Sequence, residues 1–363
     1  MTSPFFAVIL AGGGGERFWP FSTPARPKQF LDVFGGRSLI RQAAERVATL
    51  APPENLIVIT GAAFAQATQQ ELPFIPPANI IAEPCRRDTA PACALACGEA
   101  IRRGGADSVV AILPADHVIA DAPSFRRILA DAAQAARKTS SIVTLGIAPT
   151  RPATGFGYIK LGAEAPLGLA TPFRKAERFV EKPSAATAME YLSSGSYVWN
   201  AGMFVWRAAA MRTALQASPQ LAALADAVAS RDAALPLHDL LAQTYPSLER
   251  ISIDYAVMEK SPDILVGEGT FGWDDVGTWA AADAHLPQDS LGCVRLGAST
   301  LLDCENTVCV QRGDIPVAAI GVKDLIVAAT ETGVLVAAKN RAADLKLLLA
   351  KLNSASWKNN ATK

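Results

Sequence analysis

The chain has 363 residues, half of them hydrophobic, which suits one large domain with a smaller one. Its 34 basic and 34 acidic residues balance to a formal charge of zero, so the composition does not favour nucleic acid or an anionic membrane as a partner. No apolar run reaches the roughly 18 residues of a membrane helix, and the N-terminus lacks the basic start of a signal peptide. The six cysteines form no CxxC pair, which favours buried free thiols over a redox or zinc role. We therefore expect a cytoplasmic protein.

Up to Thr150, short β-branched runs alternate with helical stretches. Helices are expected at 38–51, behind a Ser38 cap, and at 90–103, with Pro91 in the first turn. This alternation predicts an α/β fold with a doubly wound, mostly parallel sheet. The strands are expected at Phe6–Leu10, Asn55–Thr60, Asn79–Ala82, Ser108–Leu113 and Ser141–Gly146.

Beyond Thr150 the pattern loosens, and from about Pro287 short strand candidates follow one another without helices. We therefore predict two domains, 1–286 and a small β domain at 287–363 with a closing helix at 342–352. Further strands are expected at Gly157–Leu161, Arg178–Glu181, Gly202–Trp206, Thr307–Gln311, Val317–Gly321, Leu325–Thr330 and Gly333–Lys339. Further helices are expected at Ala185–Leu192, Ala208–Ala217 and Pro219–Ala229.

Four glycines, 12–15, follow the first strand directly. Residues without a Cβ let backbone N–H groups approach phosphate oxygens, although a glycine run alone is equally typical of a plain loop. The spacing matches neither a P-loop nor a dinucleotide-binding motif. Instead, Arg17 and Lys28 follow among prolines, which places two cations around one loop.

The stretch AVILAGGGGERFWPFSTPARPKQFL resembles the signature of sugar-1-phosphate nucleotidyltransferases, and its FWPFS and PKQF parts resemble the GDP-mannose pyrophosphorylase branch. The resemblance implies a Rossmann-like nucleotidyltransferase fold whose glycine turn cradles a triphosphate. Glu16 and Thr23 depart from the family pattern, and we expect Glu16 to face solvent or Mg²⁺-bound water. The implied nucleotide-binding residues are Leu10, Ala11, Gly12, Gly13, Arg17, Lys28, Glu83, Thr89, Ala90 and Asp116.

Glu83 begins EPCRRDTAPA, which resembles the guanylyltransferase version of this loop. Guanine offers a ring N–H and an exocyclic amine on one edge, and a carboxylate, which only accepts, can take both bonds. A site that leaves one of these buried groups unpaired loses about 1–3 kcal/mol. The alternative is an ordinary residue at a strand end.

LPADHVI places Asp116 just beyond a strand, and GWDDVGTW supplies Asp274 and Asp275. Each alone is only an aspartate in a loop. Together they resemble the family's paired metal ligands, which implies Mg²⁺ held by Asp116 and Asp275. His117 has no matching cluster of ligands and is interpreted as structural.

Three further motifs, GFGYIKLG, FVEKPS and WNAGMF, resemble the family's sugar-binding wall, although each alone could be a strand edge with turn residues. Asp254, in IDYAVMEKS, is expected to support this wall. The implied substrate-binding residues are Gly157, Tyr158, Glu181, Lys182 and Asn200.

The resemblance covers roughly residues 5–345 and implies transfer of GMP from GTP to mannose 1-phosphate, with Arg17, Lys28, Asp116 and Asp275 as the catalytic set. It also implies a C-terminal short left-handed β-helix and a homo-oligomer, such as a dimer. Longer relatives continue into an isomerase domain, so no isomerase activity is expected. Two alternatives stay open: a transferase for another nucleotide or sugar phosphate, and a catalytically silent sensor of nucleotide sugars.

Overall fold

A computed structural model describes residues 3–13, 15–232 and 234–354, so Gly14 of the glycine run lies outside the described residues. The chain forms two compact units. The large unit contains residues 1–12 and 40–274, and the small unit contains residues 13–39 and 275–363. The predicted boundary after residue 286 stays a prediction. No local sequence pattern predicted that residues 13–39 belong to the small unit.

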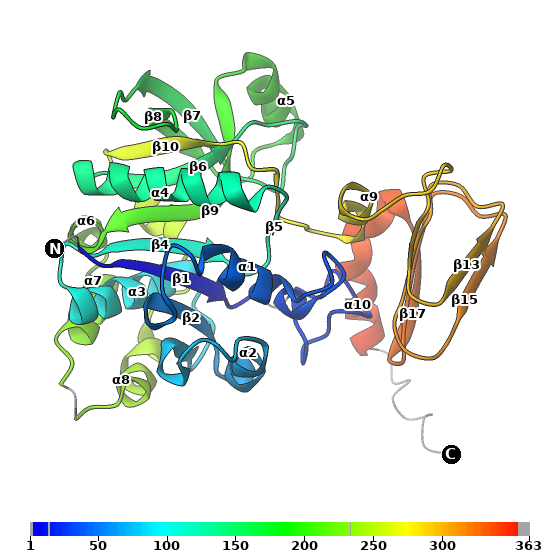
Figure 1. Cartoon of the computed structure of the whole chain (residues 1–363), viewed down its shortest axis with the longest axis horizontal. Coiled ribbons are helices and arrows are strands. Elements are labelled where there is room, and N and C mark those ends of the chain that lie inside the picture. Colours follow the sequence, from blue (N-terminus) through cyan, green and yellow to red (C-terminus); the bar gives the residue numbers. More distant parts are fainter. Residues whose placement is uncertain (1–2, 14, 233, 355–363) are drawn as a thin grey trace. The chain divides into compact units, whose positions relative to one another are not determined.

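The large unit is built on a nine-stranded sheet with the order β3-β2-β1-β4-β9-β6-β10-β8-β7 (Figure 1). The first four strands are parallel, β9 is antiparallel to β4 and β6, and β6 pairs in parallel with β10. Strands β8 and β7 add antiparallel pairs at the far edge. The sheet is therefore mixed, and only part of it matches the predicted parallel arrangement. The bounds are β1 Phe5–Ala11, β2 Leu56–Gly61, β3 Ile80–Glu83, β4 Val109–Pro114, β6 Ile142–Ile147, β7 Tyr158–Glu164, β8 Phe173–Val180, β9 Tyr197–Arg207 and β10 Ile264–Gly269.

The strands and helices expected from the sequence are present in the large unit, with ends that shift by a few residues. Strand β8 begins five residues before the predicted 178–181 segment and ends at Val180. Helix α4 packs against β4, β6, β9 and β10. The helices are α1 Leu39–Val47, α2 Ala65–Glu71, α3 Thr89–Gly104, α4 Ala122–Lys138, α5 Ala185–Ser194, α6 Ala208–Ala214, α7 Pro219–Ala229 and α8 Leu237–Thr244, with short turns η6 Tyr245–Ser247 and η7 Asp254–Met258.

The main core of the large unit lies where α3, α6 and α7 pack on one face of the sheet. Helices α3 and α7 approach closely at Gly98, where an added Cβ would lie 2.6 Å from the Ala225 carbonyl oxygen. The next residue, Glu99, has no exposed surface. Its carboxylate accepts hydrogen bonds from Arg102 at 2.8 Å and from Arg103 at 2.7 Å, and it also meets Arg231. One buried charge therefore joins α3 to the chain that follows α7.

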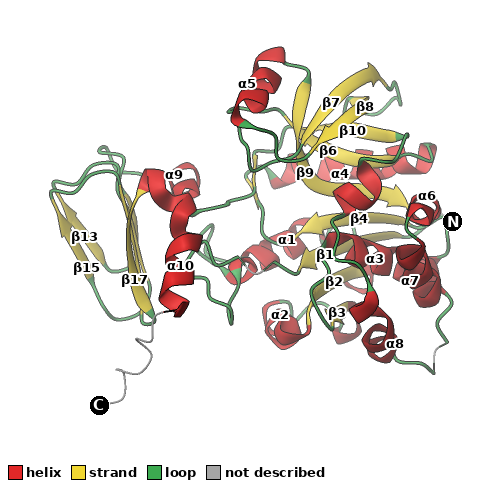
Figure 2. Cartoon of the chain, turned by 180° about the vertical axis from the view of Figure 1, so that it is seen from behind, coloured by secondary structure: helices red, strands yellow, loops and turns green. Residues whose placement is uncertain are grey.

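The small unit contains the short strands of the C-terminal region. Strands β12, β14 and β16 pair in parallel, β17 pairs antiparallel with β16, and β13 pairs in parallel with β15. Figure 2 labels β13, β15 and β17 of this region. The strands predicted from Thr307 onwards are all present. The bounds are β12 Val294–Leu296, β13 Ser299–Leu302, β14 Val308–Gln311, β15 Val317–Ile320, β16 Leu325–Thr330 and β17 Gly333–Ala338, with α9 Ala282–His285 and α10 Leu345–Ser354.

The FWPFS motif packs inside the small unit. Phe18 and Phe21 make edge-to-face contacts with Trp279, at centroid distances of 5.1 and 5.2 Å. Trp19 lies against Gly333, where an added Cβ would be only 2.6 Å from the indole ring. This aromatic packing explains why residues 13–39 group with the C-terminal strands. Among the described residues, no helix combines the length and apolarity that crossing a bilayer requires.

Candidate functional site

Three predicted site segments follow the carboxyl ends of neighbouring parallel strands in the large unit. Gly12 follows β1, Glu83 ends β3, and Asp116 lies two residues beyond β4. Because β3, β2, β1 and β4 are neighbours and parallel, these residues lie along one edge of the sheet. The fold therefore brings to one sheet edge groups that are more than a hundred residues apart in sequence.

Hydrogen bonds fix the start of the glycine turn. The Leu10 carbonyl accepts from the Ala115 N–H at 3.0 Å, and the Ala11 carbonyl accepts from the Thr60 hydroxyl at 3.0 Å. Gly12 lies beside Glu83, since an added Cβ would be 3.4 Å from Glu83 Oε2. The predicted base-reading carboxylate thus reaches the first residue of the turn. Gly13, which belongs to the small unit, is exposed.

Glu83 is a buried carboxylate with a side-chain partner that the sequence did not suggest. It is 8% exposed, and its Oε1 accepts a hydrogen bond from the fully buried Tyr245 hydroxyl. Burial raises the pKa of Glu83, and the bond from Tyr245 opposes that rise. Sequence patterns miss Tyr245 because a single tyrosine at a helix end carries no motif.

Thr89 and Ala90, at the start of α3, bind protein backbone in this structure. The Thr89 hydroxyl accepts from the Ile253 N–H at 2.9 Å, and the Ala90 N–H donates to the Ile251 carbonyl at 3.1 Å. The helix is capped by Asp88, whose carboxylate accepts from the Thr89 N–H at 2.9 Å. The predicted contacts of Thr89 and Ala90 with a nucleotide stay predictions.

The predicted sugar-binding residues converge from three segments of the large unit. The Asn200 N–H donates to the Gly157 carbonyl at 2.8 Å, and Lys182 Nζ donates to Glu181 at 2.7 Å. An added Cβ on Gly157 would lie 2.5 Å from Glu181 Oε2, so only glycine fits there without displacing the carboxylate. The Asn200 side-chain amide donates to Asp254 at 2.8 Å. These groups form a polar cluster of hydrogen-bond donors, acceptors and one exposed cation.

Asp254 supports this cluster, as the sequence suggested. Burial and the nearby Glu181 charge raise its pKa to about 6, while the Asn200 amide opposes the rise. Tyr158 is different from its predicted neighbours. Its ring is fully buried, 5.4 Å from Tyr191, and its buried hydroxyl has no hydrogen-bond partner among the described residues. Its predicted contact with a sugar stays a prediction.

The two aspartate motifs are paired inside the large unit. Strand β11 (Trp273–Asp274) pairs antiparallel with β5 (Val118–Ile119), which follows Asp116 by two residues. The Trp273 indole donates to His117 Nδ1 at 3.0 Å. This bond gives His117 a structural role, as predicted. Asp275 is the next residue after the paired strand.

In the small unit, Arg17, Lys28 and Asp275 also lie together. Lys28 Nζ donates to the Asp275 backbone carbonyl. An added Cβ on Gly277 would lie 3.5 Å from both Asp275 carboxylate oxygens and 3.7 Å from Arg17 Nη1. The predicted cations and the predicted metal ligand therefore surround one turn.

The turn after Asp275 is strained. Val276 is fully buried and has a φ of 47°, a left-handed conformation that costs a β-branched residue on the order of 1–3 kcal/mol. Strained backbone of this kind gathers at functional sites, where the surrounding structure enforces it. The observation supports a functional role for the GWDDVGTW motif.

The donor chemistry of the aspartate motifs fits Mg²⁺. Asp116 and Asp275 offer only oxygen, and the Asp116 side chain is 35% exposed. Mg²⁺ binds through one or two carboxylates and keeps water or phosphate as its other ligands. Among residues 3–13, 15–232 and 234–354, no group of three or more His, Cys, Asp or Glu side chains could hold a metal ion by itself.

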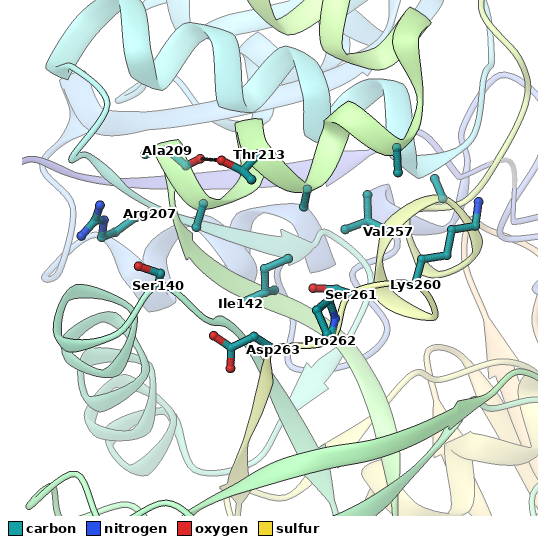
Figure 3. A pocket seen from close by; sticks show the side chains of 14 residues that line it. Ser140, Ile142, Arg207, Ala209, Thr213, Val257, Lys260, Ser261, Pro262 and Asp263 are labelled. Atoms are coloured by element: carbon teal, nitrogen blue, oxygen red, sulfur yellow. Dashed lines mark hydrogen bonds between the residues drawn. The ribbon is translucent and has the colours of Figure 1, made fainter.

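A pocket of about 440 Å³ lies elsewhere in the large unit (Figure 3). Its lining includes Ile142 at the start of β6, Arg207 at the end of β9 and Asp263 just before β10. These positions lie at the opposite edge of the sheet from Gly12 and Glu83. None of the predicted site residues lines it.

In comparisons with known protein families, two different families match two parts of the chain. The family description "Nucleotidyl transferase" matches residues 6–286, and "MannoseP isomerase/GMP-like beta-helix domain" matches residues 297–352. The xanthan biosynthesis protein XanB of Xanthomonas campestris is 39% identical over 97% of this chain and 74% of its own length. A mannose-1-phosphate guanylyltransferase of Escherichia coli is 38% identical over 93% of this chain and 72% of its own length.

A crystal structure from Thermus thermophilus is similar over nearly the whole chain. It is described as a mannose-1-phosphate geranyltransferase and is 36% identical, with a TM-score of 0.86. The match covers 97% of this chain and all of the other. The similarity thus extends through both the nine-stranded sheet and the C-terminal β region.

Proposed function

From the premise that this chain belongs to the nucleotidyl transferase family, among the mannose-1-phosphate guanylyltransferases, we propose that it joins GTP to mannose 1-phosphate. The chain is a nucleotidyltransferase enzyme. It transfers GMP from GTP to the sugar phosphate and releases pyrophosphate, which gives GDP-mannose. The sugar-binding cluster carries this proposal, because Gly157, Glu181, Lys182 and Asn200 converge within it.

The chemical obstacle in this reaction is charge. The attacking sugar phosphate is already an anion, so the reaction requires no general base. Two like charges 4 Å apart repel by about 4 kcal/mol at an effective dielectric constant near 20. Arg17 and Lys28 offset this repulsion on the triphosphate, and Lys182 does so on the sugar phosphate. The exposed Lys182 ammonium forms an ion pair with Glu181 at 2.7 Å, which supports the proposed role of this cation toward an incoming anion.

Asp116 and Asp275 would hold Mg²⁺, a proposal that rests on their sequence motifs and on their oxygen-only chemistry. A divalent ion bound there would neutralise charge on the phosphates. The protein's own contribution is to position both phosphates with fixed cations, so that little reorganisation is needed during the reaction.

Glu83 would select the base. An ionised carboxylate accepts from both the ring N–H and the exocyclic amine of guanine, whereas uracil offers one donor. The position of Glu83 beside Gly12 supports this role, because a base reader must lie near the turn that holds the triphosphate.

Further parts of the proposal concern the fold and the cell. We propose a left-handed winding for the C-terminal β-helix domain and a doubly wound arrangement of helices around the large sheet. A homodimer is proposed from the family resemblance. The six cysteines are all free in the structure, which supports a reducing compartment such as the cytoplasm.

A pyrophosphate-release assay tests the proposed function. The purified chain is supplied with Mg²⁺, each of GTP, ATP, UTP and dTTP, and each of mannose, glucose and galactose 1-phosphate. The expected result is preferential turnover of GTP with mannose 1-phosphate. Preference for another pair would reassign the substrates, and no release with any pair would favour a silent nucleotide-sugar sensor.

A further inference from the structure

One short segment of the large unit, residues 245–254, runs alongside the base-reading loop. Its backbone bonds to the Ala90 N–H and to the Thr89 hydroxyl, and the Ile251 N–H also donates to the Arg87 carbonyl at 3.3 Å. The Arg87 guanidinium in turn donates to the Pro246 carbonyl. The 245–254 segment therefore both donates hydrogen bonds to the loop that carries Glu83 and accepts hydrogen bonds from it.

This fixed segment places a phenol against one oxygen of the Glu83 carboxylate. Tyr245 has no exposed surface, and its hydroxyl donates to Glu83 Oε1. The other oxygen, Oε2, is the one that lies beside Gly12. Because one oxygen is held and the other faces the turn, the carboxylate has a defined orientation toward a base bound there.

We propose that Tyr245 is a positioning residue for guanine selection, which orients Glu83 and keeps it in the acceptor-only form that guanine requires. The inference rests on the proposed function of Glu83. A phenol in this position donates a hydrogen bond to the carboxylate, and this bond is strongest when the carboxylate is ionised. A protonated Glu83 would present a donor to the donor edge of guanine and would lose the match.

The surroundings of Glu83 explain why such a partner is needed. Burial raises the pKa of Glu83, so the neutral form becomes more accessible. The titratable groups that also face this pair are Cys93 on α3 and Cys85 after β3, and burial raises the pKa of the Cys93 thiol. Neither thiol supplies a positive charge, whereas the hydrogen bond from Tyr245 lowers the pKa of Glu83.

The test compares wild type, Tyr245→Phe, Glu83→Gln and the double variant. Equilibrium binding of GTP and of ITP, which lacks the exocyclic amine, is measured by calorimetry. Tyr245→Phe keeps the ring and removes only the hydroxyl, so we expect GTP affinity to fall about tenfold, as for the loss of a hydrogen bond to a charged group. ITP affinity should fall less. The loss for GTP should grow as the pH is lowered, because burial raises the pKa of Glu83.

The matched control is Tyr197→Phe, which removes a hydroxyl at the start of β9, where the ring stacks on Tyr191 at 3.8 Å. It should leave GTP binding unchanged. If Tyr245 acts through Glu83, the double variant should bind GTP about as well as Glu83→Gln alone. The inference is overturned if Tyr245→Phe leaves GTP affinity unchanged, or if its effect simply multiplies that of Glu83→Gln.

Binding separates this inference from the proposed function. A wild-type chain that binds GTP more tightly than ITP but releases no pyrophosphate would contradict the enzymatic proposal and still report on Tyr245. A wild-type chain with active turnover and no difference between GTP and ITP would remove guanine selection from both Glu83 and Tyr245. Circular dichroism of each variant identifies any that fail to fold. If Tyr245→Phe is one of these, the pH dependence of GTP binding is compared between wild type and Glu83→Gln instead.

Discussion

Replacing Asp254 with asparagine should stabilise the protein at neutral and alkaline pH. Asp254 accepts a hydrogen bond from Asn200 and is partly buried. Burial, followed by the charge of Glu181, raises its pKa from the ordinary 3.8 to about 6. When folding raises the pKa of a carboxyl group, that group contributes its full stability to the fold at pH values below its pKa in the unfolded chain. This contribution is lost as the pH rises through its pKa in the folded chain. The ionised form of Asp254 is therefore a cost to folding above pH 6.

The size of this cost follows from the two pKa values. A difference of about two units corresponds to about 3 kcal/mol of unfolding free energy at pH 8, and to about 1.5 kcal/mol at pH 5, where the unfolded chain alone is mostly ionised. An asparagine keeps its carbonyl oxygen as an acceptor for Asn200 and does not titrate. The advantage of Asp254→Asn over wild type should therefore shrink by about 1.5 kcal/mol between pH 8 and pH 5.

Urea unfolding followed by circular dichroism at pH 8, 6.5 and 5 measures this difference. Glu164→Gln, which replaces an exposed carboxylate at the end of β7, is the matched control. A constant difference between Asp254→Asn and wild type across the three pH values would refute the argument, because it would mean that Asp254 titrates alike in the folded and unfolded chain.

Three further substitutions test the catalytic and packing arguments. Asp116→Asn should lower kcat by roughly 10²-fold or more while the unfolding free energy changes by less than about 0.5 kcal/mol, and retained Mg²⁺-dependent turnover would remove it from the metal site. Glu99→Gln should cost about 3 kcal/mol in urea unfolding, because three arginines lose their buried carboxylate; a change below about 1 kcal/mol would contradict this. Gly98→Ala, which ordinarily stabilises a helix by about 1 kcal/mol, should here destabilise by about 1–3 kcal/mol, since the new methyl group would meet the Ala225 carbonyl at 2.6 Å. A higher melting temperature for Gly98→Ala would refute the packing argument.

The strands before Thr150 and from Thr307 onwards could be predicted because each is encoded by a local run of residues. Runs such as those of β1 and β4 are apolar and β-branched over five or six residues, which is enough to identify a strand buried on both faces. The antiparallel insertion of β9 between β4 and β6 has no such signal, because the partner of a strand depends on distant segments. The predicted mostly parallel sheet was therefore right about the first four strands and incomplete for the rest.

The residues of the candidate site also differ in whether a local motif or only the fold points to them. Motifs predicted site roles for Glu83, Glu181, Lys182 and Asn200, since each residue type at its spacing resembles a known family pattern. Tyr245 had no pattern to identify it, and its role emerges only from the bond to Glu83. Tyr158 shows the converse, because a motif marked its position and the fold buries its ring.

The sequence by itself determined the family, the strand-forming segments and the residue types available for binding anions, since these depend on composition and on spacing along the chain. Tertiary structure alone decided that residues 13–39 pack with the C-terminal strands and that Tyr245 holds Glu83. Both depend on contacts between residues more than a hundred positions apart. Such contacts are set by the packing of whole faces against one another, and no short stretch of sequence carries that information.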